Sequence, residues 1–148
     1  ETRILDVCTT LDDTIALTSL LVCIMRMLYR LRTRNQRWRI YTPMLIRENR
    51  WRAMRYSFDE GMIDLAKGVV VPFEDLMDEM LSLVSEDAEA LGCEKELADV
   101  REILSRGTSA HRQLKDYELE RANGASVEDS LKAVVDTLVS DTAEGLNS

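Results

Sequence analysis

An apolar run at residues 15–25 is the feature that most constrains what this chain can fold into. Charged residues bound it on both sides: Asp12, Asp13, Arg26, Arg30 and Arg32. The run covers about eleven residues, whereas a membrane-spanning helix needs ~20, so we expect a buried helix and no membrane partner. Thr10 and Asp13 have the spacing of a helix-capping box, which predicts a helix from about residue 11 to about Arg34. Its expected buried stripe consists of Leu17, Leu20, Leu21, Ile24, Met25, Leu28 and Leu31.

Helical patterns account for most of the remaining sequence. Thr42 and Pro43 predict the start of a second helix, which ends at about Tyr56. Further helices are expected at about 73–91, 94–105 and 109–122, with a last helix after Ser126.

β-structure is expected in only two places. Two short apolar runs around Gly68 predict a hairpin within residues 61–73, and residues 1–8 have the pattern of a short strand. The sequence therefore predicts a mostly helical α+β fold in one domain, residues 1–148. Its expected parts are a strand (1–8), two helices (11–56), a hairpin (61–71) and a helical region (73–144).

The predicted strand at residues 1–8 has no evident neighbour in this sequence. An isolated strand leaves its backbone donors and acceptors unpaired, and one small hairpin does not make a stable sheet. We therefore expect the remaining sheet strands to belong to sequence absent from this chain. The alternative is an irregular arm that lies on the helices.

The cysteine and histidine content bears on disulfide and zinc sites. Cys8, Cys23 and Cys93 are an odd number without a CxxC pair, and His111 is the only histidine. This pattern argues against a disulfide framework and against a zinc site, and it favours a cytoplasmic protein. We expect each cysteine to be a small core residue and His111 to be structural or exposed.

Positive charge is concentrated in one segment of an acidic chain. The net charge is -8, but residues 26–55 hold ten arginines and one acid, so that segment carries +9 and the remainder -17. Arginine suits bidentate pairing with phosphate or carboxylate, so the segment predicts an anionic ligand or acidic partner surfaces.

Two alternative functions of the basic segment stay open. A nucleic-acid-binding module would use these arginines with nearby aromatic residues, although the acidic remainder makes nucleic acid an unfavourable partner. A helical interaction module would pair them with its own acidic helices.

Two short stretches could carry chemistry. On a strand, Glu1 and Arg3 share a face, so the carboxylate could hold a divalent metal and the guanidinium a phosphate or carboxylate; the ordinary alternative is an exposed ion pair. The stretch "ENRWRAMRY" places Asn49, Arg52 and Tyr56 on one helix face, with further arginine and aromatic side chains beside them. That face could bind an anion.

The ordered series of motifs resembles a known family. "ETRILDVCTTLDD", "LIRENRWRAMRYSFDEGMIDL", "VVPFEDL" and "REILSRGTSAHRQL" occur in the order found in type 2 glutamate–cysteine ligases and related carboxylate–amine ligases of the glutamine synthetase superfamily. The resemblance covers residues 1 to about 120. It implies that this chain is the C-terminal part of a glutamine synthetase-like catalytic domain, inactive without its N-terminal part.

The resemblance also implies an activity and candidate residues. The implied reaction is ATP-dependent amide formation through an acyl phosphate, with ATP and Mg²⁺ as cofactors. Expected partners are glutamate or a similar carboxylate, a small amine or amino acid, and the N-terminal part of the enzyme; a homo-oligomer is left open. By carry-over, Glu1 is a candidate Mg²⁺ ligand and Arg3 a candidate catalytic and substrate-binding residue. Asn49, Arg52 and Arg55 are candidate substrate-binding residues near the active-site mouth.

Overall fold

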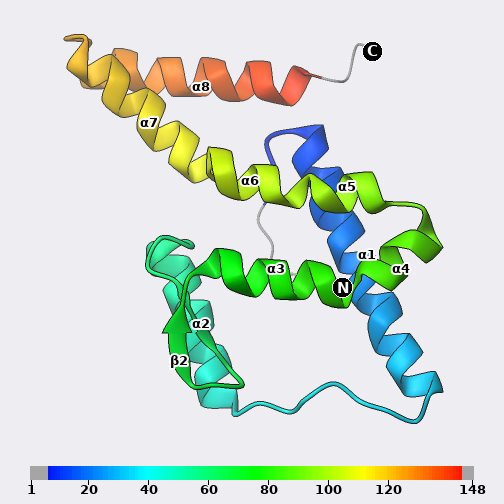
Figure 1. Cartoon of the computed structure of the whole chain (residues 1–148). Coiled ribbons are helices and arrows are strands. Elements are labelled where there is room, and N and C mark those ends of the chain that lie inside the picture. The colour runs from blue at the N-terminus through cyan, green and yellow to red at the C-terminus, as the bar shows by residue number, and fades with distance from the viewer. Residues whose placement is uncertain (1–6, 145–148) are drawn as a thin grey trace. The chain divides into compact units, whose positions relative to one another are not determined.

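The computed structural model describes residues 7–144, which form two compact units (Figure 1). Within the described residues, unit 1 comprises 7–19 and 95–144, and unit 2 comprises 20–94. The long helix α1 (Leu11–Thr33) begins in unit 1 and continues into unit 2. The chain therefore passes between the units twice, once within α1 and once after Glu94.

Unit 2 contains a two-stranded sheet among helices. After α1 come α2 (Pro43–Tyr56), β1 (Met62–Asp64), β2 (Val69–Val71), α3 (Phe73–Leu83) and α4 (Ser85–Leu91). The strands are antiparallel, with Met62 opposite Val71 and Asp64 opposite Val69. The core of unit 2 contains Leu20, Cys23, Met27, Met62, Leu81, Val84 and Ala88.

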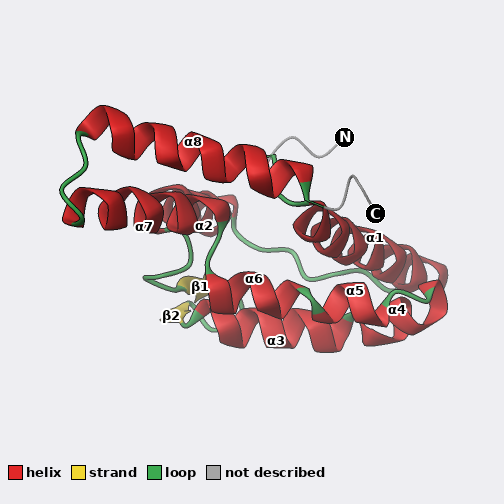
Figure 2. Ribbon diagram, turned by 90° about the horizontal axis from the view of Figure 1, so that it is seen from above, coloured by secondary structure: helices red, strands yellow, loops and turns green. Residues whose placement is uncertain are grey.

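All helices and no strands make up the regular structure in the described part of unit 1. It contains α5 (Glu94–Ala98, whose first residue belongs to unit 2), α6 (Val100–Arg106), α7 (Ser109–Ala122) and α8 (Val127–Ala143). Figure 2 shows α7 and α8 side by side after the short turn that joins them. Ser126 caps α8 by accepting a hydrogen bond from the Asp129 backbone N–H at 3.1 Å, as the sequence predicts.

The hairpin was predicted correctly, and Asp64 explains its turn. The Asp64 carboxylate accepts hydrogen bonds from the backbone N–H groups of Ala66 (2.9 Å) and Lys67 (3.1 Å). The Lys67 ammonium lies 2.8 Å from the same carboxylate, and its hydrogen bond is the main reason that the pKa of Asp64 is lowered. Gly61 immediately precedes β1 and has φ of +67°. A Cβ at this position would lie 2.3 Å from the Val71 carbonyl oxygen. Only glycine permits so close an approach.

The start of α1 follows the predicted capping residue. The Thr10 hydroxyl accepts a hydrogen bond from the Asp13 backbone N–H at 3.3 Å. By length and composition alone, α1 could cross a membrane. However, its Asp13, Arg26 and Arg30 form ion pairs with side chains of other helices. These pairs support the prediction of a helix that packs within a folded protein.

The buried stripe of α1 differs from the prediction. The buried positions are Ala16, Leu20, Cys23 and Met27, whereas Met25 is 62% exposed and Leu28 43% exposed. Apolar residues surround most of this helix, so hydrophobicity did not identify the inner face. Of the predicted stripe only Leu20 is buried, and the small residues Ala16 and Cys23 share the inner face with Leu20 and Met27.

Two predicted helices are interrupted. The predicted helix at 73–91 breaks at buried Val84, which has φ of -100° and ψ of 4° and separates α3 from α4. The Ser85 hydroxyl donates to the Ser82 carbonyl at 2.9 Å in the same turn. The predicted helix at 94–105 likewise divides into α5 and α6 at Asp99. Neither break contains a glycine or proline, so the sequence did not predict it.

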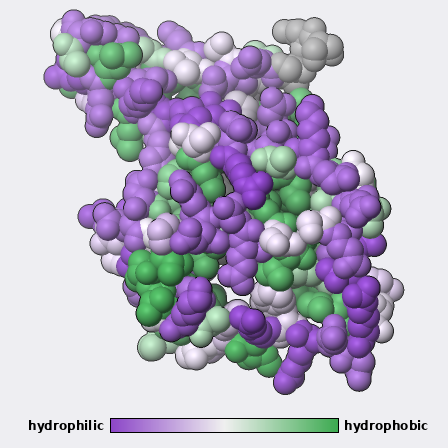
Figure 3. All heavy atoms as spheres, in the orientation of Figure 1, coloured by the Kyte–Doolittle hydropathy of each residue, from purple (hydrophilic) through white to green (hydrophobic). Residues whose placement is uncertain are grey.

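The predicted leading strand lies almost entirely outside the described residues. Only Val7 and Cys8 of it are described, and neither is in a strand. The described residues form a mostly helical α+β structure with one small antiparallel hairpin. Figure 3 shows several apolar patches among polar residues on the visible face.

Candidate functional site

Asn49 and Arg52 connect α2 to the hairpin. The Asn49 amide donates to the Ile63 carbonyl oxygen at 2.8 Å and accepts from the Ile63 N–H at 2.7 Å. The Arg52 guanidinium donates to the Gly61 carbonyl oxygen at 3.1 Å and to the Glu60 carbonyl oxygen at 2.6 Å. The Asn49 contacts pair the backbone of Ile63 in β1, and the Arg52 contacts pair the carbonyl groups of the two residues just before β1. Both predicted substrate-binding residues therefore have structural partners.

Arg55 lies on a more exposed part of the same helix. Its guanidinium carbon is 6.0 Å from the centre of the Tyr56 ring, and Trp51 contacts that ring edge-to-face with 5.5 Å between centroids. Trp51 remains 47% exposed. Arg55 is exposed, so its guanidinium is accessible from solvent. The predicted grouping of arginine and aromatic residues is thus present on α2.

The other two candidate residues, Glu1 and Arg3, lie outside the described residues. Within residues 7–144, no group of three His, Cys, Asp or Glu side chains is arranged to hold a metal ion. The described part alone therefore does not build a Mg²⁺ site.

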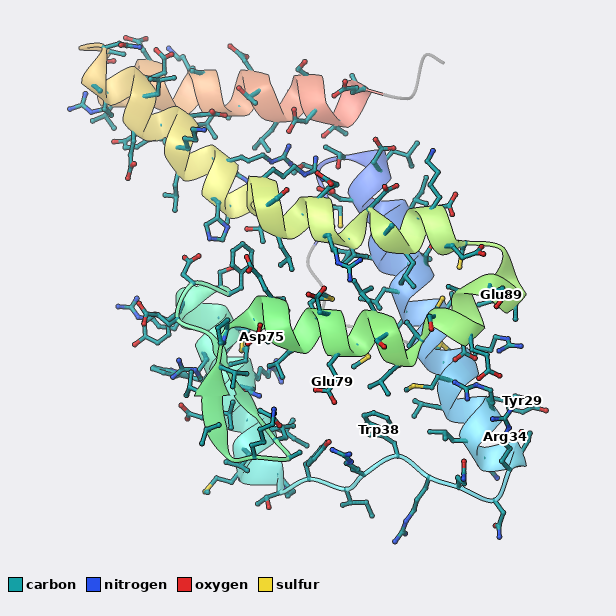
Figure 4. All side chains as sticks on the ribbon, in the orientation of Figure 1. Tyr29, Arg34, Trp38, Asp75, Glu79 and Glu89 are labelled. Carbon is teal, nitrogen blue, oxygen red and sulfur yellow. The ribbon has the colours of Figure 1, made fainter. Side chains whose placement is uncertain are left out.

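Three arginines of the basic segment pair with α4. Arg26 lies 2.5 Å from the Asp87 carboxylate, and Arg30 donates to both carboxylate oxygens, at 3.2 and 2.7 Å. Arg30 also lies 3.1 Å from Glu86, and Arg34 lies 3.4 Å from it. Figure 4 labels Arg34, which directly follows Thr33, the last residue of α1. The four-residue spacing places Arg26 and Arg30 on one face of α1, and Arg34 follows at the same spacing just past the helix end.

Asp87 is completely buried, and its charge depends on these arginines. Hydrogen bonding from Arg30 is the main cause that holds the pKa of Asp87 below its usual range, while burial acts in the opposite direction. The sequence showed the excess of arginine but not its internal partners. Glu86 and Asp87 belong to a separate acidic helix, and only the folded chain brings them beside α1.

Unit 1 contains a second cluster of charges, which the sequence analysis did not combine. Asp13 pairs with Arg106 and lies 3.9 Å from Arg112, which is also 3.2 Å from Asp141. The Arg112 Nε is buried without a hydrogen-bond acceptor among the described residues. These residues come from α1, α6, α7 and α8, so sequence spacing could not reveal the cluster.

An open cavity of about 420 Å³ adjoins this cluster. Its lining residues are Arg106, His111, Arg112, Lys115, Asp116, Thr137 and Asp141. His111 has a structural role there, because its Nδ1 accepts a hydrogen bond from the Thr108 backbone N–H at 3.1 Å and completes the cap of α7. The lining offers both signs of charge, which suits a small polar ligand.

Comparisons with known proteins give the family. The family described as glutamate-cysteine ligase family 2 (GCS2) matches residues 1–136. A protein of Rhodospirillum rubrum, provisionally named glutamate–cysteine ligase 2, is 51% identical over 148 residues, which are 100% of this chain and 38% of that protein. Proteins with the same provisional name from Jannaschia sp. and Sorangium cellulosum are 48% and 44% identical. The matches cover 95% and 99% of this chain, and 37% of each relative.

The chain thus spans less than two-fifths of the length of these relatives. No solved structure matches it. The family match extends over more than nine-tenths of the chain, including α2, the hairpin and the α7 cap. The chain therefore belongs to glutamate–cysteine ligase family 2.

Proposed function

We propose that this chain is part of an ATP-dependent ligase that joins the γ-carboxylate of glutamate, or a similar carboxylate, to the amino group of cysteine or another small amine. The observation that carries the proposal is the family match over residues 1–136. The complete catalytic domain would have a glutamine synthetase-like fold, lie in the cytoplasm and include an N-terminal part that completes the sheet.

The proposed reaction has two steps. A carboxylate oxygen of the substrate attacks the γ-phosphorus of ATP, which releases ADP and leaves an acyl phosphate. The amine nitrogen then attacks the acyl carbon, which releases phosphate and forms the amide. Such phosphoryl transfer requires in-line positioning and positive charge near the transferring oxygens, and it requires no nucleophilic side chain from the protein.

Arg3 is the proposed catalytic arginine of this chain, because a guanidinium can bind a carboxylate or phosphate through two parallel hydrogen bonds. Glu1 would contribute one carboxylate to a Mg²⁺ site. The described residues do not fit a complete site, so the other ligands would come from sequence outside this chain. We therefore assign no step to the metal ion.

The test is amine-dependent ADP release by a protein of the length of the relatives that contains this chain. In the presence of Mg²⁺, we expect turnover that depends on each of the three substrates, which are ATP, glutamate and cysteine. Arg3→Ala should reduce kcat/KM at least tenfold while the helical circular dichroism stays unchanged. Arg39→Ala, an exposed arginine of the α1–α2 connector, is the matched control and should retain activity. The absence of turnover with every amino acid pair would contradict the proposal.

Arg55 is the most accessible of the three substrate-binding candidates on α2. We expect Arg55→Ala in the same longer protein to raise KM for the carboxylate substrate by about tenfold, with little effect on unfolding, because an exposed charge contributes little to stability. Initial rates across a substrate series, combined with urea unfolding, check both expectations. An unchanged KM would exclude Arg55 from the substrate site.

A second candidate, a nucleic-acid-binding module, loses support from the ion pairs. Arg26, Arg30 and Arg34 contact Asp87 or Glu86, and Arg52 contacts backbone carbonyl groups. These contacts favour the alternative in which part of the basic segment pairs internally. Salt-sensitive retention of a labelled oligonucleotide by the chain would restore the nucleic-acid candidate.

A further inference from the structure

Two cysteines that are far apart in sequence meet in unit 2. The sulfur atoms of Cys23 in α1 and Cys93 after α4 are 3.5 Å apart, and both are free thiols. Cys23 is fully buried, whereas Cys93 is partly exposed. A disulfide requires about 2.05 Å between the sulfur atoms, so a further approach of roughly 1.5 Å would allow the bond.

Local structure holds Cys93 beside α1. Gly92 ends α4 with φ of +67°, and the Cys93 N–H then donates to the Ala88 carbonyl oxygen at 3.1 Å. This is a C-terminal helix cap that a left-handed glycine makes possible. The pairs that Asp87 forms with Arg26 and Arg30 fix α4 against α1 one to two turns beyond Cys23. Both sulfur positions are therefore set by neighbouring structure.

We propose that Cys23 and Cys93 form a thiol–disulfide exchange site that accepts oxidising equivalents from low-molecular-weight disulfides. In the first step the Cys93 thiolate attacks the small disulfide, forms a mixed disulfide and releases one small thiol. In the second step the Cys23 thiolate attacks the Cys93 sulfur, forms the internal disulfide and releases the second small thiol. The two protein thiols lose two electrons and two protons in total, and the small disulfide gains them.

The difference in burial sets the order of the steps. Cys93 is the thiol that a reagent can reach. Burial is the largest cause that raises the pKa of Cys23 to about 12; the neighbouring Cys93 and Asp87 raise it further and Arg26 lowers it. Only a small fraction of Cys23 is thiolate at neutral pH, so the second step is slow and the mixed disulfide accumulates. Closure from the isolated mixed disulfide should accelerate by roughly tenfold per pH unit between about pH 7 and 9.

The bond would connect one position close to where the chain enters unit 2 with another close to where it leaves. Cys23 follows the passage at Ser19–Leu20, and Cys93 precedes the passage at Glu94–Lys95. Oxidation would therefore link covalently the first and the last part of unit 2. Because the bridged positions are 70 residues apart, we expect oxidation to raise the Tm by an amount on the order of 10 °C.

The test treats the 148-residue chain with bis(2-hydroxyethyl) disulfide, blocks the remaining thiols and maps linked peptides by mass spectrometry. We expect the Cys23–Cys93 peptide to dominate and Cys8 to remain free. The same reaction in concentrated guanidinium should give a mixture of the possible pairings. Cys8→Ser, the matched control, should keep both the linked peptide and the rise in Tm. Cys93→Ser should lose both.

Two results would overturn the proposal. The first is a mixture of pairings under native conditions that equals the mixture in guanidinium. The second is a mixed disulfide on Cys93 that never closes, even at alkaline pH.

Discussion

Replacement of Asp87 by Asn is expected to lower the free energy of unfolding of unit 2 by about 3 kcal/mol at neutral pH. Asp87 is completely buried, and Arg26 and Arg30 direct their guanidinium groups to its carboxylate. The amide keeps the side-chain volume but removes the negative charge. It leaves the Arg30 guanidinium, which is only 18% exposed, without its buried anion. The loss of one partner of a buried pair is the costly change.

Glu86→Gln is the matched control for this replacement. Glu86 also pairs with Arg30 and with Arg34, but its side chain is 57% exposed. An exposed ion pair contributes at most about 1 kcal/mol, so the control should unfold almost as the unchanged protein does. Urea unfolding followed by tryptophan fluorescence measures unit 2 in particular, because both tryptophans, Trp38 and Trp51, belong to it. Equal losses from the two replacements would contradict the assigned role of Asp87.

The effect of Asp87→Asn should disappear in acid. The folded-state pKa of Asp87 lies below its usual range, chiefly because of the hydrogen bonds from Arg30. Its contribution to stability is therefore complete above the unfolded-state pKa of about 4 and is lost as the pH falls through the folded-state pKa. The unfolding curves of the two proteins should converge as the pH is lowered below about 4. A constant difference across this range would mean that the carboxylate charge is not the cause.

Replacement of Asn49 by Ala is the second large expected effect, a loss of about 2 kcal/mol in the free energy of unfolding of unit 2. The amide of Asn49 makes two hydrogen bonds with the backbone of Ile63, one as donor and one as acceptor. Alanine removes both and leaves the partly buried N–H and C=O groups of Ile63 without these partners. The amide hydrogen of Ile63 should then exchange with solvent faster, which NMR detects directly.

The Asn49→Ala variant also distinguishes a structural role of Asn49 from a role in substrate binding. Arg50→Ala changes an exposed neighbour on the same helix and should leave both stability and the Ile63 exchange rate unchanged. If Asn49→Ala instead preserves stability but raises KM in the longer protein, Asn49 binds substrate and its hydrogen bonds to the hairpin are dispensable. Loss of stability with unchanged KM would remove Asn49 from the candidate substrate-binding residues.

Local sequence predicted the elements whose determinants lie within a few residues. The start of α1 at Thr10 and the cap of α8 at Ser126 depend on side chains that bond to the adjacent backbone, and the start of α2 depends on the fixed φ of Pro43, since Thr42 makes no side-chain cap there. The hairpin at residues 62–71 was predictable for the same reason, because Asp64 and Gly68 form its turn locally. The ordered motifs of the chain were also sufficient to indicate its family.

Tertiary structure decided which of these residues meet. The sequence could not assign Arg26 and Arg30 to Asp87, bring Asp13 to Arg106 and Arg112, or place Cys23 beside Cys93, because each contact joins residues more than 50 positions apart. It also could not select the inner face of α1, whose apolar residues occur on several sides. Helix periodicity specifies which residues share a face, but the partner of that face is set by packing, burial and charge in the folded chain.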